Sequence, residues 1–152
     1  MKYIVAILFI IGLQSFAQNL ETKILKPYHK DFVDISENYN FEGVTKYLIT
    51  AKVTGHGNYS WFFNEKSYKN GSLDSSYGQS VNSVYAYLMI EDHGGYLQKS
   101  KFQDFANEVY LPYFIYEYCL IDDADQDGIP ELYFTYFGMS DGLDSKPLKV
   151  IV

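Results

Sequence analysis

Apolar and polar residues alternate with a period of two along much of this chain. The clearest case is 44–54, where apolar side chains occupy every second position: Tyr47, Ile49, Ala51 and Val53. This alternation predicts a strand with one face toward solvent, and the turn at 55–58 followed by the aromatic run 59–63 predicts a hairpin. The segment 84–90 is apolar at both alternating positions, so we expect a central strand that is covered on both faces.

The C-terminal third contains three further predicted strands, at 113–121, 132–137 and 147–152. The last ends inside an apolar run, which indicates either a fragment or an edge strand that closes the sheet. One segment instead has helical spacing, because Phe102, Phe105, Ala106 and Val109 fall at i, i+3, i+4 and i+7. We therefore predict a short amphipathic helix over 99–109.

The predicted fold class is mainly β, an antiparallel sheet of about five to seven strands with one short helix. A single β-rich domain is expected over 44–152. The segment 18–43 has mixed charge and little periodicity, which predicts an extended lead-in with a short strand or helical turn around 32–35. The aromatic content supports a β-rich domain, since the 16 Tyr and 11 Phe suit half-buried sheet surfaces.

The first 17 residues have the layout of a secretory signal peptide. Lys2 precedes an apolar run over 4–13, and Ser15 and Ala17 supply small residues for cleavage after Ala17. The apolar run is too short to span a bilayer. The remaining chain has no apolar run of spanning length, so we expect an exported protein, periplasmic or secreted to the cell surface, without a transmembrane segment.

Charge and cysteine content narrow the classes of partner. The formal net charge is -7, the chain has no Arg, and its Lys residues are scattered singly. The sequence therefore lacks the basic patch that a nucleic-acid or anionic-membrane partner would need. Cys119 is the only cysteine, which rules out an internal disulfide, and its aromatic surroundings predict a buried, inert thiol.

The stretch 121–132 sets five carboxylates between two apolar runs. Asp123, Asp125 and Asp127 alternate, Gly128 permits a sharp turn, and the backbone carbonyl of Ile129 is available. This spacing reproduces positions 1, 3, 5, 6 and 7 of a calcium loop. Position 12 is Phe134, so Glu131 at position 9 would have to complete the site. The predicted metal ligands are Asp123, Asp125, Asp127, Ile129 and Glu131, and the alternative is a solvated acidic turn.

This loop resembles the D-x-D-x-D-G calcium hairpins of FG-GAP-type repeats over about a dozen residues. More widely, the acidic turn 125–131, the aromatic strands on either side of it, Ser140-Asp141 and 146–149 resemble a family of small exported Bacteroidota proteins labelled as surface polysaccharide biosynthesis proteins. The resemblance covers roughly the last 70 residues. It implies a role at the cell envelope connected with surface polysaccharide.

The leading interpretation is a non-catalytic, calcium-binding β-domain that acts in binding or assembly at the bacterial envelope, with carbohydrate or an envelope protein as partner. The rings expected to stack on a sugar are Trp61, Tyr59, Tyr85 and Tyr87. One alternative is a polysaccharide-processing enzyme, with Glu91 or Asp92 paired to Glu117, or Cys119 paired to His56 or His93. None of these pairs has a recognised catalytic spacing, so no catalytic residue is predicted. A second alternative is a purely structural envelope protein.

Overall fold

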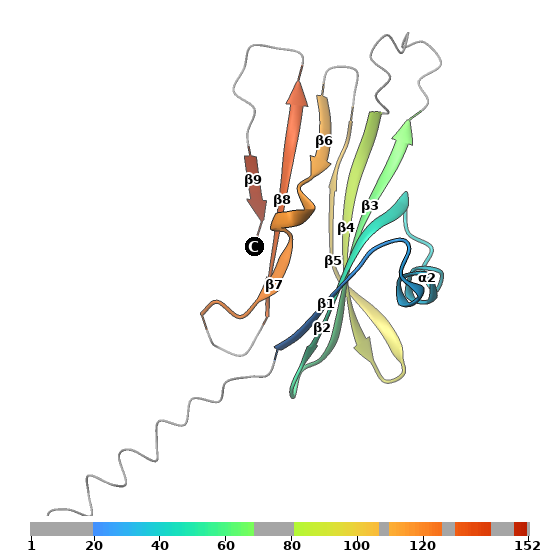
Figure 1. Cartoon of the computed structure of the whole chain (residues 1–152), viewed down its shortest axis with the longest axis vertical. Helices are drawn as coiled ribbons and strands as arrows, with labels where there is room; N and C mark the ends of the chain where they lie inside the picture. Colours follow the sequence, from blue (N-terminus) through green and yellow to red (C-terminus); the bar gives the residue numbers. More distant parts are fainter. Residues whose placement is uncertain (1–19, 69–80, 107–109, 126–129, 141–147, 152) are drawn as a thin grey trace, which may run out of the picture.

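The computed structural model describes residues 20–68, 81–106, 110–125, 130–140 and 148–151. The predicted leader at 1–17 lies outside these residues. Over the described residues the chain is mainly β with one α-helix, which confirms the predicted fold class. The strands are divided between two antiparallel sheets (Figure 1).

The first sheet has five strands in the order β1-β2-β3-β4-β5. They are β1 (Leu20–Leu25), β2 (Val44–Val53), β3 (Gly57–Tyr68), β4 (Val81–Asp92) and β5 (Gly95–Asp104). The predicted hairpin is confirmed by the pairing of β2 with β3, and the predicted central strand by the pairing of β4 with β3 and β5.

The second sheet is organised around β8 (Glu131–Ser140), which pairs with β6 (Tyr110–Phe114), β7 (Leu120–Asp122) and β9 (Leu148–Ile151). The continuous strand predicted over 113–121 is wrong. A 3-10 helix, η1 (Tyr116–Tyr118), separates β6 from β7, and Ile115 N–H donates to the Thr135 carbonyl at 2.8 Å as the chain passes β8. The return strand predicted at 132–137 is confirmed within β8.

The helix predicted over 99–109 is also wrong, because 95–104 forms strand β5 and 107–109 lies outside the described residues. His93 (φ 47°) and Gly94 (φ 81°) form a two-residue turn between β4 and β5. Two successive residues with positive φ match the twist of a hairpin, so the turn sends the chain back along β4. Phe102 then packs toward the interior, while 95–101 is exposed.

Two hydrophobic clusters cover the two faces of the first sheet. Between the sheets lie twelve buried residues: Tyr47, Ile49, Ala51, Trp61, Phe63, Val84, Ala86, Phe114, Cys119, Ile121, Phe134 and Tyr136. The opposite face carries a second cluster: Leu25, Phe32, Leu48, Phe62, Tyr85, Tyr87 and Met89. Successive residues of β2, β3 and β4 therefore enter different clusters, as strand geometry requires. The prediction that one face of 44–54 meets solvent is therefore wrong at Leu48, which alternates with Tyr47 and Ile49 and is buried in the second cluster.

The second cluster is covered by the N-terminal segment. Helix α2 (Lys30–Ser36) contributes Phe32, and the rings of Tyr39 and Phe41 pack beside Phe62. Figure 1 shows α2 and the second sheet on opposite sides of the first sheet. The helical turn expected around 32–35 thus exists, and it is part of the folded domain.

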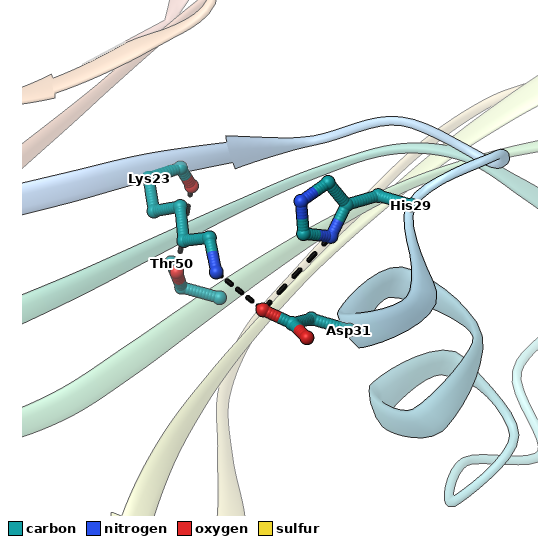
Figure 2. A network of polar contacts seen from close by, with 4 residues as sticks. All are labelled: Lys23, His29, Asp31 and Thr50. Carbon is teal, nitrogen blue, oxygen red and sulfur yellow. Dashed lines mark hydrogen bonds and ion pairs between the residues drawn. The ribbon is translucent and has the colours of Figure 1, made fainter.

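Polar contacts attach α2 to the edge strand β1. Figure 2 shows Asp31, in the first turn of α2, between Lys23 of β1 and His29. The ammonium of Lys23 donates to the Asp31 carboxylate, and His29 Nδ1 lies 3.9 Å from the same oxygen. The hydrogen bond and charge of Lys23 lower the pKa of Asp31, so the carboxylate keeps its charge into mildly acidic solution.

The chain enters β2 through Gly43, whose conformation no other residue type can easily adopt. Its φ is +81°, and a Cβ there would lie 2.7 Å from the backbone oxygen of Glu65. The preceding residue, Glu42, makes two hydrogen bonds through its backbone. Its carbonyl accepts from the side chain of Asn64 at 3.1 Å, and its N–H donates to the Tyr87 hydroxyl at 3.3 Å. These contacts hold the covering segment against the sheet.

Candidate metal centre

The acidic loop begins at the last register pair of the β7–β8 hairpin. Leu120 faces Tyr133, Ile121 faces Leu132, and Asp122 faces Glu131, after which the strands separate. Ile121 anchors the hairpin in the core between the sheets. The final pair places two carboxylates directly opposite each other, an arrangement that destabilises a sheet in the absence of a cation.

The structure brings together three of the five predicted ligands. Asp123, Asp125 and Glu131 each offer a carboxylate oxygen, and these oxygens lie within 4.8 Å of one another. Asp123 and Glu131 are half-buried, whereas Asp125 is exposed. The other two predicted ligands, Asp127 and Ile129, lie outside the described residues.

The separation of these oxygens suits a calcium ion. Calcium–oxygen bonds are about 2.3 to 2.6 Å long, so two ligands on opposite sides of one ion are about 4.6 to 5.2 Å apart. Oxygens within 4.8 Å of one another can therefore belong to the same coordination sphere. All three donors are carboxylates, the hard ligands that calcium prefers over softer nitrogen or sulfur.

Two backbone hydrogen bonds fix the start of the loop. Asp123 N–H donates to the side chain of Asp122 at 2.9 Å, and Ala124 N–H donates to Glu131 Oε2 at 2.8 Å. The second bond joins the two ends of the loop, so Glu131 is oriented toward the aspartates by the chain itself. The sequence predicts Glu131 as the closing ligand but assigns no role to Asp122, whose position opposite Glu131 depends on the strand register.

The charge of the cluster contributes to a raised pKa at the neighbouring residue Tyr133. Tyr133 lies two residues after Glu131 on β8, and its pKa is raised by desolvation and then by the negative charges of Glu131, Asp122 and Asp125. Negative potential raises the pKa of a phenol because the phenolate would add another negative charge. The same potential attracts a cation to this end of the hairpin.

The aromatic residues predicted to stack on a sugar are mostly core residues. Trp61 lies in the cluster between the sheets, and Tyr85 and Tyr87 lie in the cluster beneath α2, all three buried. Tyr59 is half-buried against the first cluster. The three buried rings stabilise the fold and cannot present a ring face to a ligand.

The hypothetical Cys119–His pairs are not assembled in the part of the chain that the structure describes. Cys119 is buried between the sheets, and its thiol points to the Ile115 carbonyl at 3.5 Å. Burial raises the pKa of this thiol from 9.0 to about 11, which keeps it protonated and unreactive. His56 and His93 lie in exposed turns, where His93 contacts its neighbour Asp92.

One polar contact between the sheets was not foreseen from the sequence. The hydroxyl of Tyr116, in η1, donates to Glu65 Oε1 of β3 at 2.7 Å. Desolvation and then this bond raise the pKa of Tyr116, so it stays a donor at all physiological pH values. The two residues are 51 positions apart, and only the tertiary fold brings them together.

No helix among the described residues is long and apolar enough to cross a membrane. Comparisons of the chain with protein-family models, with curated proteins and with solved structures gave no match.

Proposed function

We propose that this chain is an exported, non-catalytic calcium-binding β-domain that acts in binding or assembly at the bacterial cell envelope. The observation that carries the proposal is the convergence of the Asp123, Asp125 and Glu131 carboxylates within 4.8 Å at the end of the β7–β8 hairpin. Export rests on the signal-peptide pattern of residues 1–17. The connection with surface polysaccharide rests on the sequence resemblance of the C-terminal part.

Calcium would contribute to stability here because the chain has a single cysteine and cannot form an internal disulfide. An ion that bridges Asp123 to Glu131 would join the two ends of the loop and neutralise the facing pair Asp122 and Glu131. Small exported domains commonly use a metal or disulfides to supplement a modest core. The proposed ion would serve that purpose at the C-terminal hairpin.

Two exposed rings in 110–118 are better candidates for sugar stacking than Trp61, Tyr59, Tyr85 and Tyr87. Tyr118 is 63% exposed and Tyr113 is 42% exposed. Tyr113 is packed on one side against Phe137, with ring centroids 5.5 Å apart, so its other side can contact a ligand. Tyr113 belongs to β6 of the second sheet, and Tyr118 belongs to η1, which connects β6 to β7. We assign the binding role to this part of the domain, which also includes the acidic loop.

Calorimetric titration of the mature domain with calcium tests the proposal. We expect one site with an affinity on the order of 0.1 to 1 mM, as in other extracellular calcium modules. The substitution Asp125→Ala should abolish the heat of binding, while Glu37→Gln, a change of an exposed carboxylate beyond helix α2, should preserve it. Equal binding by the wild type and Asp125→Ala would remove the loop from the proposed function.

A further inference from the structure

The segment 115–122 links the proposed calcium loop to the interface between the sheets. We call it the connector, and it contains η1 and β7. Three of its side chains enter or line the core between the sheets: Tyr116, Cys119 and Ile121. Its last residue, Asp122, receives a hydrogen bond from the first residue of the acidic loop. One short segment therefore contacts both the loop and the first sheet.

The first sheet holds the connector through Tyr116. The Tyr116 hydroxyl donates to Glu65, and its ring is stacked on Tyr47 with centroids 4.9 Å apart. Tyr47 and Glu65 belong to β2 and β3. A connector that left its place would lose these contacts together, because they come from one side chain.

At its loop end, the connector is joined to β8 by a short pairing, and Ile121 packs into the core. Strand β7 makes only three register pairs with β8, and the last is the like-charged pair Asp122 and Glu131. Repulsion within this pair, and among the three converging carboxylates, favours separation of the strands at the loop. Segments with short pairing and internal repulsion open at lower free energy than a central strand.

We propose that calcium occupancy of the loop controls the opening of the connector, so that the ion determines how firmly 115–122 is docked against the first sheet. This inference rests on the proposed calcium binding. An open connector separates Glu131 from Asp123, and the open form therefore binds the ion weakly. The open population should then fall by a factor of 1 + [Ca²⁺]/Kd, about 100-fold when calcium is at 100 times Kd.

Amide hydrogen exchange measured by mass spectrometry on the mature domain tests this coupling. The amide of Ile115 is a suitable probe because it donates to the Thr135 carbonyl of β8, and the amides of Tyr118 and Cys119 show whether η1 itself stays folded. We expect them to exchange faster than those of central strand β4 in the absence of calcium. Saturating calcium should slow connector exchange by up to about 100-fold and leave β4 almost unchanged under native conditions.

The variant Tyr116→Phe tests the docking contact directly, because it removes only the hydroxyl that binds Glu65. Loss of one hydrogen bond to a carboxylate should speed connector exchange about tenfold at a fixed calcium concentration, without removing any proposed ligand. The Tyr116 hydroxyl lies 2.7 Å from Glu65. Removing this single oxygen atom weakens docking and keeps the aromatic ring. Unchanged connector exchange in this variant would overturn the inference.

Three results separate this inference from the proposed function. If calorimetry shows calcium binding but connector exchange does not respond, the coupling is wrong and the calcium site stands. If calcium slows the connector and β4 equally, the ion acts through global unfolding, which also overturns the coupling. If calorimetry shows no binding, the proposed function itself fails, and the coupling fails with it.

Discussion

Neutralising Glu131 should have opposite effects on stability with and without calcium. The variant Glu131→Gln keeps an oxygen that can accept the 2.8 Å hydrogen bond from Ala124 N–H, but it removes one of three converging charges. In calcium-free solution the change relieves repulsion, so the variant should be more stable than the wild type. With calcium present it removes a ligand, so the order should reverse.

The distances in the loop set the size of the calcium-free effect. Two unit charges 4.8 Å apart, the upper limit of the separations in the cluster, repel by about 0.9 kcal/mol in water, and Glu131 converges with two other carboxylates, those of Asp123 and Asp125. Removing its charge should therefore stabilise the calcium-free domain by up to about 2 kcal/mol, or about 1 kcal/mol after screening by salt. For a domain of this length the melting temperature should rise by about 4 °C.

Calcium should add more to the wild type than the charge removal adds to the variant. At about 10 mM calcium and a Kd on the order of 0.1 to 1 mM, binding stabilises the folded state by about 1.4 to 2.7 kcal/mol. This corresponds to a rise of about 6 to 11 °C in the wild type. Glu131→Gln should show a small fraction of that rise.

Thermal unfolding followed by circular dichroism, in EDTA and in calcium at matched ionic strength, measures both effects. Glu37→Gln changes the same charge outside the loop and should show the full calcium-dependent rise. Two results would refute the reasoning: a Glu131→Gln domain that melts below the wild type in EDTA, or one that gains as much from calcium as the wild type does. Either would mean that the carboxylates do not act on a shared ion.

Three further predictions concern the rest of the fold. Burial raises the pKa of Cys119 to about 11 from 9.0, so alkylation of the folded domain at pH 8 should be at least about 100-fold slower than after denaturation, as a thiol-reactive dye would show. Gly138→Ala should lower the free energy of unfolding by about 1 to 3 kcal/mol in urea titrations, since a Cβ there would lie 2.2 Å from the Tyr110 ring. The pKa of Asp31 is lowered by Lys23, so Asp31→Asn should reduce the melting temperature at pH 7, with the difference disappearing as pH falls through the lowered pKa.

The Gly138→Ala prediction has a control in the same chain. Gly95→Ala adds the same methyl group where the nearest atom is at 3.6 Å, and it should change stability little. A loss of stability equal to that of Gly138→Ala would show that crowding is not the cause. For Asp31→Asn, a difference that persists at a pH low enough to protonate Asp31, where both chains are uncharged at this position, would exclude the ion pair as its origin.

Strands β2, β3 and β4 of the first sheet could be predicted from sequence because they have repetitive patterns of apolar positions. Val84, Tyr85 and Ala86 are consecutive apolar residues that enter opposite clusters, which only a strand covered on both faces can accommodate. The helix predicted over 99–109 failed because four apolar positions are weak evidence for helical periodicity. The turn at His93 and Gly94 directs the chain along β4, and pairing with a central strand outweighs a local preference.

The interruption of the predicted strand by η1 corresponds to a change in the spacing of core-facing residues. The positions that face the core between the sheets are 114, 116, 119 and 121, so the spacing changes from two to three and back to two. A uniform strand would keep a spacing of two. Because 113–121 is apolar or aromatic at nearly every position, the change could not be recognised before the core was known.

The acidic loop shows what spacing can and cannot predict. Alternating aspartates and a closing glutamate indicated which carboxylates would converge, and Asp123, Asp125 and Glu131 do so. That these carboxylates bind calcium stays a prediction. The opposition of Asp122 and Glu131 follows from the register of β7 on β8, and the Tyr116–Glu65 bond from the packing of two sheets. These two contacts link the loop to the core. Repulsion between Asp122 and Glu131 acts at one end of the connector, and the hydrogen bond from Tyr116 to Glu65 acts near the other end, so both affect the same eight residues.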